Sequence, residues 1–170
     1  MRPRTLLFGF SGLLLIAVLG CGNEGKDPER PNKLAEAAVS ILKKGTVFEL
    51  HSLDPAIVPS KEVKGFDGYT SLGKTIITDA KVREKLLSAL LDGIAKSDGS
   101  GAFCFEPRHG IRAKLDDQTV ELLICFECLQ IHVSYTDGHQ EVLTTGDPQK
   151  IFDEVLKKAD VPLPKPAGKE

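Results

Sequence analysis

The chain has 170 residues, of which 41% are hydrophobic and 27% charged, and its formal net charge at pH 7 is −2. This length supports one domain with a real hydrophobic core, and a mildly acidic balance without a basic stripe argues against a nucleic-acid partner. The chain also contains four cysteines, at positions 21, 104, 125 and 128.

The N-terminal segment predicts export. Two arginines lie in MRPR, and residues 5–20 (TLLFGFSGLLLIAVLG) carry no charge. The apolar run is too short for a comfortable membrane span and has the layout of a secretory signal peptide, which we place at residues 1–20. It ends in Val18-Leu19-Gly20-Cys21, which resembles the lipobox of bacterial lipoproteins. An ordinary signal peptide and an uncleaved anchor are the alternatives.

The lipobox resemblance implies a lipid anchor on Cys21. It implies that the sulfur is diacylated, for example with palmitate, that the chain is cleaved before Cys21, and that the new N-terminus is usually acylated too. Two or three acyl chains hold a protein stably at a membrane. The polar residues up to Asn32 then form a tether, so that 21–32 is the anchored linker. Gly22, which is not Asp, favours the outer membrane by analogy with lipoprotein sorting in two-membrane bacteria.

The first half of the mature chain predicts two helices and two strands. KLAEAAVSILKK (33–44) has the apolar spacing of a short helix, which Gly45 ends, and TVFEL (46–50) has the composition of a strand. Residues 65–78 contain two turn signals followed by a strand into Ile77. Residues 79–96 form the strongest predicted helix, because apolar residues recur four positions apart and Thr78 or Asp79 provides an N-cap.

The second half predicts strands. Apolar and polar residues alternate in 111–115, 120–126 and 129–135, with a turn at Asp116-Asp117. Asp137-Gly138 is a hairpin signal that leads into 140–144.

A final helix begins at Asp147-Pro148. The chain ends in PLPKPAGKE (162–170), of which residues 164–170 form an extended tail in this interpretation. Together these elements predict one α+β domain over 33–163, an antiparallel sheet of about four to six strands with helices packed on one side.

The apolar positions change parity at CFEC (125–128), from even numbers before Phe126 to odd numbers after Cys128. Because a strand has a period of two, the change requires one extra residue or a chain reversal. No Gly, Pro or Asn lies between Ile124 and Ile131, so we expect a β-bulge, not a tight turn. The bulge would place Cys104, Cys125 and Cys128 on one face.

With Cys21 committed to lipid, the other three cysteines cannot all pair within the chain. One interpretation is a disulfide from Cys104 to Cys125 or Cys128 with one thiol left over. Another is a zinc-like site of Cys104, His109, Cys125 and Cys128, since C-x2-C is a usual ligand spacing. His109 shares the parity of Ile111, which puts it on the opposite face, so His132 is the alternative fourth ligand.

Two further readings of the cysteines stay open. The thiols are either inert core residues, or Cys104 and His109 form a nucleophilic pair of a thiol-dependent enzyme. A thioredoxin-type site is not expected, because there the C-x-x-C lies at a helix N-terminus and here it lies among strands.

Four stretches occur in the order ELHSLDP, GFDGYTSLGKT, CFEPRHGIR and ICFECLQI. With them the chain resembles, over about residues 46–163, a group of uncharacterised small exported bacterial proteins, and the CFxPRH…ICFxC pair is the most specific part. The resemblance implies that this motif acts as a unit, but it supplies no chemistry.

The sequence as a whole favours a non-enzymatic, lipid-anchored cell-envelope protein whose domain binds a ligand or a protein partner. A metal-binding envelope protein is the first alternative, and a thiol-dependent enzyme is the second.

Overall fold

The computed structural model describes residues 32–55, 65–136 and 138–165. The predicted signal peptide, Cys21 and all of the tether except Asn32 lie outside these ranges, as does Asp137 of the predicted hairpin turn. No helix within the described ranges is long and apolar enough to cross a membrane.

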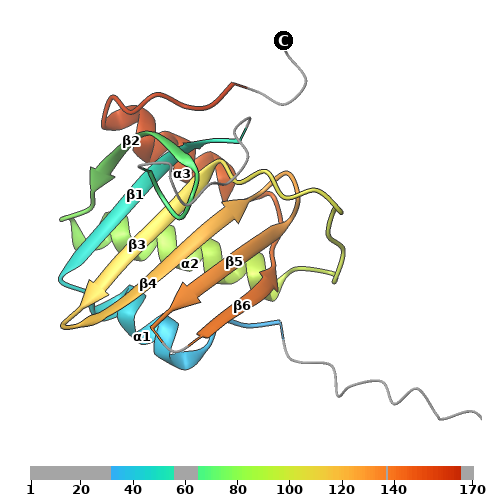
Figure 1. Cartoon of the computed structure of the whole chain (residues 1–170), viewed down its shortest axis with the longest axis horizontal. Helices are drawn as coiled ribbons and strands as arrows, with labels where there is room; N and C mark the ends of the chain where they lie inside the picture. The colour runs from blue at the N-terminus through green and yellow to red at the C-terminus, as the bar shows by residue number, and fades with distance from the viewer. Residues whose placement is uncertain (1–31, 56–64, 137, 166–170) are drawn as a thin grey trace, which may run out of the picture. The chain divides into compact units, whose positions relative to one another are not determined.

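A six-stranded antiparallel sheet forms the centre of the domain, with the strand order β2-β1-β3-β4-β5-β6 (Figure 1). The strands are β1 (Val47–Asp54), β2 (Thr70–Ile76), β3 (His109–Leu115), β4 (Gln118–Cys125), β5 (Gln130–Tyr135) and β6 (Gly138–Leu143). The last four strands follow one another along the chain as hairpins, so most of the sheet is made by local reversals. The predicted α+β class and the antiparallel sheet are confirmed.

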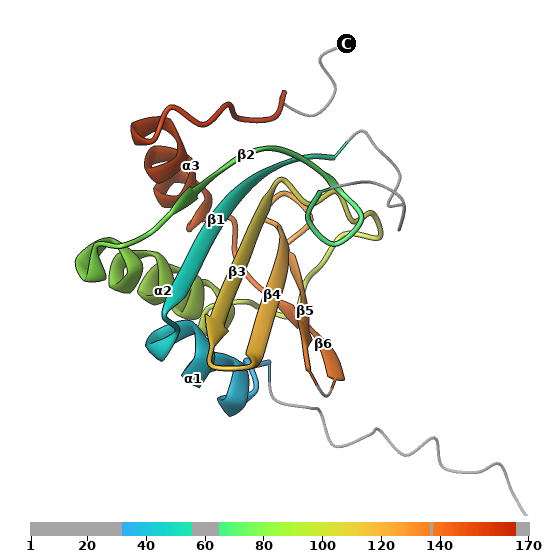
Figure 2. The same cartoon turned by 60° about the vertical axis from the view of Figure 1, so that its left-hand side comes forward.

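Three helices cover one face of the sheet: α1 (Glu36–Lys44), α2 (Ala80–Ala95) and α3 (Gln149–Lys158) (Figure 2). Asp79 caps α2, because its side chain accepts hydrogen bonds from the backbone N–H groups of Lys81 at 2.7 Å and Val82 at 3.3 Å. These bonds satisfy two of the donors that the first turn of a helix leaves unpaired.

The main hydrophobic core lies between this face of the sheet and the helices. Alternate strand residues point into it, as the period of two requires, and Leu86 and Leu90 of α2 meet them from the helical side. The strand residues of this core are Phe48, Leu50, Ile111, Ala113, Val120, Leu122, Ile124, Ile131, Val133 and Val142.

A second, smaller cluster lies on the other face of the sheet and is separate from the main core. It contains Leu53, Tyr69, Leu123 and Phe66, the last of which belongs to the turn before β2. The Phe66 ring lies over Gly110 of β3, where an added Cβ would approach a ring carbon to 2.9 Å. Glycine at position 110 therefore allows the turn to pack directly on the strand.

The parity change at CFEC is a chain reversal, and the predicted β-bulge is wrong. β4 ends at Cys125 and β5 begins at Gln130, and these two residues pair across the hairpin, as do Ile124 and Ile131. Leu129 supplies the left-handed backbone conformation that the turn needs, with φ 58°, although no Gly or Asn is present. Both isoleucines therefore face the helices.

The two ends of the described domain are held by hydrogen bonds. The Asn32 amide accepts from the Leu143 N–H at 2.7 Å and donates to the Leu143 carbonyl at 3.0 Å, so the last predicted tether residue is attached to the edge strand β6. Lys165, which we predicted to lie in the tail, accepts a hydrogen bond on its carbonyl from Arg108. The folded unit thus extends slightly beyond 33–163 at both ends.

The contact between Gly110 and Phe66 gives a stability prediction. We expect Gly110→Ala to lower the free energy of unfolding in urea by about 1–3 kcal/mol, because Phe66 is fully buried and cannot move aside freely. Gly146→Ala is the matched control, since its added Cβ would meet nothing closer than the Phe126 carbonyl oxygen at 3.6 Å. Equal losses in the two variants would contradict this account of the turn.

Candidate functional site at the disulfide loop

A disulfide joins Cys125 and Cys128 across the four-residue loop between β4 and β5. The two Cα atoms are 5.1 Å apart, and the residues are only 1% and 2% exposed. The backbone N–H of Cys128 donates to the sulfur of Cys125 at 3.1 Å. The loop is therefore closed both covalently and by a hydrogen bond within the same four residues.

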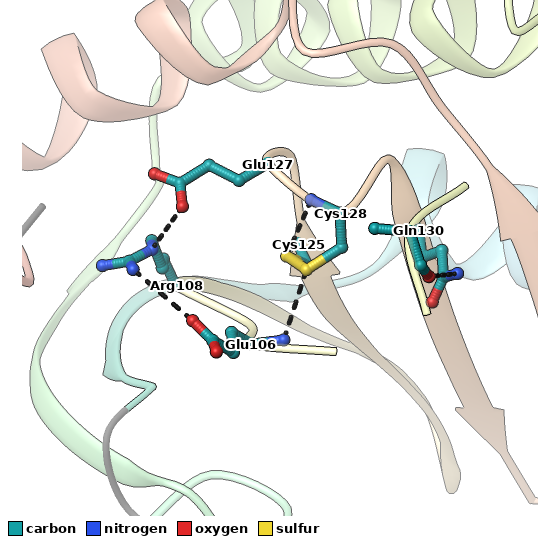
Figure 3. Close-up of a disulfide and its surroundings, with 7 residues drawn as sticks. Glu106, Arg108, Cys125, Glu127, Cys128 and Gln130 are labelled. Carbon is teal, nitrogen blue, oxygen red and sulfur yellow. Dashed lines mark hydrogen bonds and ion pairs between the residues drawn. A yellow bond between two sulfur atoms is a disulfide. The ribbon is translucent and has the colours of Figure 1, made fainter. Parts of the chain in front are cut away.

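The segment that enters β3 crosses this loop and is bonded to it at several points (Figure 3). The Ala102 N–H donates to the Cys128 carbonyl at 3.0 Å, and the Ala102 carbonyl accepts from the Gln130 side chain at 2.6 Å. Farther along, the Glu106 N–H donates to the Cys128 sulfur at 3.3 Å and the Arg108 N–H donates to the Ile124 carbonyl at 3.1 Å. Residues 102–108 therefore run alongside the end of β4 and the disulfide loop.

Arg108 carries a buried charge between two carboxylates. Its side chain is 7% exposed, and its guanidinium lies 3.3 Å from a carboxylate oxygen of Glu127 and 3.8 Å from one of Glu106, as Figure 3 shows. It also donates to the Lys165 carbonyl. Since a buried charge is costly unless it is paired, the two carboxylates account for the burial of this guanidinium, although its Nε atom makes no hydrogen bond with the described residues. Arg108 thus links the crossing segment, the disulfide loop and the C-terminal segment.

Cys104 is the free cysteine of the described residues, and it is exposed. The predicted disulfide from Cys104 to Cys125 or Cys128 is therefore wrong, and the prediction that an odd thiol remains is confirmed. The cause is the reversal at 126–129, because it brings Cys125 and Cys128 together at the end of one hairpin. A bulged, continuous strand would have kept them apart.

The structure does not gather the predicted zinc ligands. Within the described ranges no group of three or more His, Cys, Asp or Glu side chains is placed to hold a metal ion. Cys125 and Cys128 are bonded to each other, so neither offers the thiolate that zinc requires. His109 lies on the helix face, as its parity indicated, and His132 stacks on Phe105 with ring centres 3.6 Å apart. The Cys3His arrangement, with either histidine, is not formed.

His109 belongs to a buried polar cluster beneath α3. Its Nε2 atom lies 2.9 Å from a carboxylate oxygen of Asp153, and the aromatic rings of Phe126 and Phe152 flank it. Ser52 lies directly opposite His109 on β1. The hydroxyl of Ser52 and Nδ1 of His109 have no hydrogen-bond partner among the described residues.

Ser52, His109 and Asp153 have the residue types of a nucleophile, a base and its orienting acid, but not their geometry. The serine and histidine are 0% and 1% exposed, so a substrate has no path to them, and no hydrogen bond joins them. A nucleophilic pair of Cys104 and His109 is not formed either, because one side chain is exposed and the other is buried against Asp153. We assign the cluster to stability.

The open face of the sheet carries an ionic network that the sequence reading did not identify. Glu49 accepts a hydrogen bond from the Lys74 ammonium at 2.6 Å, lies 3.1 Å from Nε2 of His51, and is 3.6 Å from the Arg112 guanidinium. Arg112 also pairs with Glu121 on β4. The only sequence signal was a polar residue at every second position of each strand, which equally indicates an ordinary solvated face.

The charges of this network balance. Burial lowers the pKa of His51 below its ordinary value, although the Glu49 carboxylate acts against this. Burial raises the pKa of Glu49, but hydrogen bonds and charges from Lys74 and His51 outweigh it, so that its pKa is lowered overall. Apart from His51, the network contains two carboxylates, Glu49 and Glu121, and two cations, Lys74 and Arg112. The network holds Phe66, whose ring centre is 4.5 Å from that of His51 and 4.9 Å from the Arg112 guanidinium carbon.

A groove of about 690 Å³ lies in the helical layer, away from all of these features in the fold. Leu87 and Leu91 of α2 line it, with Lys43 of α1 and Arg83 of α2 among the polar residues. Arg83 is already engaged, because it donates to the Gly45 carbonyl at 2.6 Å and lies over Phe48. The groove contains none of the predicted site residues.

Comparison with known proteins adds no identification. No protein family, curated protein or solved structure matches the chain. Among the residues of the site, the disulfide of Cys125 and Cys128 and the exposed thiol of Cys104 are the reactive groups.

The buried cluster beneath α3 gives a second stability prediction. We expect Asp153→Ala to lower the free energy of unfolding by about 1–3 kcal/mol, because it leaves the buried Nε2 of His109 unpaired. Ser52→Ala is the matched control and should leave stability unchanged or raise it, since its hydroxyl makes no hydrogen bond with the described residues. Urea unfolding followed by circular dichroism measures both. A larger loss in Ser52→Ala than in Asp153→Ala would refute the assignment.

Proposed function

We propose that this protein is a lipoprotein, held in the bacterial envelope by acylated Cys21, whose α+β domain binds a protein partner through the loop of residues 102–105. One observation carries the proposal. Phe103 is fully exposed, with a relative accessibility of 112%, and the exposed thiol of Cys104 follows it directly. An aromatic side chain presented in this way contributes nothing to the core of its own domain.

The anchoring of the loop supports this role. Ala102 is bonded to Cys128 and Gln130, and Glu106 is bonded to the Cys128 sulfur, so both ends of the exposed stretch are held against the disulfide hairpin. In Figure 1 the loop between α2 and β3 extends outward from the sheet. Aromatic residues are enriched among the residues that dominate binding energy, and a loop held in place loses less conformational entropy on binding.

The odd thiol supports a protein partner over a small ligand. An unpaired cysteine in an exported protein is typical of pairing with another chain or of a reactive thiol. The open face of the sheet is the alternative surface, but its ionic network is internally balanced, and Phe66 and Phe105 already cover part of it. The lipid anchor supports the same function, because it confines the domain to the membrane surface where envelope partners lie.

The role of Phe103 is tested by photo-crosslinking in intact cells of the native host. We replace Phe103 with a photoreactive phenylalanine analogue and, as a matched control, introduce the same analogue at Ile76, which is exposed by 59% on β2. We expect a discrete covalent adduct from position 103 and none from position 76. Because Phe103 would be a binding anchor, its loss should weaken the adduct formed from a neighbouring position. With the photoreactive analogue placed at position 104, Phe103→Ser should reduce the yield of the adduct about tenfold or more relative to the same protein with Phe103. Identical adducts from both positions, or none from 103, would contradict the proposal.

The anchor is tested separately with a clickable palmitate analogue. We expect the wild-type chain to incorporate the label and to lose the mass of residues 1–20, whereas Cys21→Ser should incorporate none and stay uncleaved. Urea unfolding of both proteins checks that Cys21→Ser leaves the stability of the domain unchanged. Labelling that persists in Cys21→Ser would show that the lipobox reading is wrong.

A further inference from the structure

We propose that Cys104, Cys125 and Cys128 form a thiol–disulfide exchange unit, in which Cys104 replaces Cys125 as the covalent partner of Cys128. The inference concerns the isolated chain and does not depend on the protein partner proposed above. It rests on the position of the exposed thiol relative to the buried disulfide, and on which sulfur of that disulfide faces the crossing segment.

The crossing segment brackets Cys104 between two contacts to the same residue. Ala102 is bonded to the carbonyl of Cys128, and Glu106 is bonded to its sulfur. Cys104 is two residues from each of them, so its backbone lies between two points of contact with Cys128. Ala102, Phe105 and Glu106 are held in place, whereas Phe103 and Cys104 between them are exposed, so the movement that a new disulfide requires is confined to residues 103 and 104.

The hydrogen bonds determine which sulfur is attacked. The sulfur of Cys128 receives the Glu106 N–H, which belongs to the crossing segment, so this sulfur faces Cys104's part of the chain. The sulfur of Cys125 receives the Cys128 N–H from within the loop.

The exchange is balanced without an external oxidant or reductant. The Cys104 thiol loses its proton to water, and the thiolate attacks the sulfur of Cys128. A bond forms between Cys104 and Cys128 while the bond between Cys125 and Cys128 breaks, and Cys125 leaves as a thiolate that takes up a proton. One disulfide and one thiol are present before and after the step.

The consequence is a change in what the surface offers. Before exchange the free thiol is Cys104 and is exposed, whereas after exchange it is Cys125, which lies in a position that is 1% exposed. Thiols in solution cannot reach the buried disulfide directly. They can react with the exposed Cys104, which in turn exchanges with the disulfide. The unit therefore either presents or withdraws a reactive thiol at the tip of the 102–105 loop.

The test is disulfide mapping of the lipidated wild-type chain, purified in detergent from membranes. Samples are held at pH 6 to 8.5 without added reductant or oxidant and quenched in acid. Free thiols are then alkylated, and the chain is cleaved after glutamate, since Glu127 lies between Cys125 and Cys128. We expect peptides that link Cys104 to Cys128, with Cys125 alkylated, and these should form several-fold faster at the higher pH because the thiolate is the attacking species. If Cys21 carries a free thiol in part of the sample, its alkylation is measured on a separate peptide and does not affect the count for the other three cysteines.

Two variants test the choice of sulfur. Cys125→Ser should join Cys104 to Cys128 on oxidation and lose all thiols of the domain, whereas Cys128→Ser, the matched control, should keep both Cys104 and Cys125 alkylatable. A wild-type sample that shows only the Cys125–Cys128 link at every pH overturns the proposal, and this measurement needs no substitution. Two alkylatable thiols in Cys125→Ser, in a protein that still unfolds cooperatively, overturn it as well.

Discussion

The reversal of the chain between Cys125 and Gln130 is the constraint on which the second half of the structure depends. Because strand residues alternate between faces, Ile124 and Ile131 can both face the helices only if the chain turns between them, and they are paired across the hairpin. Leu129 has to adopt a left-handed conformation that is unfavourable for a branched side chain. In the chain-entropy relation a disulfide closing so short a loop contributes about 2 kcal/mol, which is enough to offset that local cost.

The position of the candidate site depends on this hairpin. Residues 102–108 precede β3, and most of their hydrogen bonds go to the disulfide loop, Ile124 and Gln130, while Arg108 is also bonded to Leu53 and Lys165. Glu127, at the tip of the loop, also pairs with Arg108. The exposure of Phe103 and Cys104 therefore depends on where the hairpin ends. A change in the conformation of the disulfide loop would reach Phe103 and Cys104 through the hydrogen bonds of Ala102 and Glu106 to Cys128.

The elements themselves could be predicted from periodicity, because each depends on its own residues. The three helices, the α+β class, the strands after residue 109 and the face occupied by His109 all follow from apolar spacing and caps. The reversal at CFEC could not be predicted in the same way, since the parity change allowed both a bulge and a turn. The decision depended on Leu129 accepting a positive φ, for which its residue type gives no signal.

The predicted disulfide from Cys104 is wrong for a related reason. Three cysteines allow three single disulfides, and spacing does not choose among them. The choice follows from the turn at 126–129, for which the residue pattern predicts a β-bulge. The contact of Phe66 with Gly110 was equally hidden, because it joins a turn before β2 to the middle of β3 and depends on the whole sheet being assembled. Contacts between segments so far apart in the sequence are a property of the tertiary fold, and they cannot be predicted from a local residue pattern.

The division of the sheet into two faces explains why the disulfide loop can be reactive without threatening the fold. Phe126 and its neighbours Ile124 and Ile131 belong to the core beneath the helices, whereas Cys125 and Cys128 belong to neither hydrophobic cluster. The change of partner that we propose at Cys128 would therefore leave the residues of both clusters in place, and its cost would fall on the few hydrogen bonds around the loop. Buried sulfur that belongs to neither cluster is the arrangement in which covalent exchange and a stable domain are compatible.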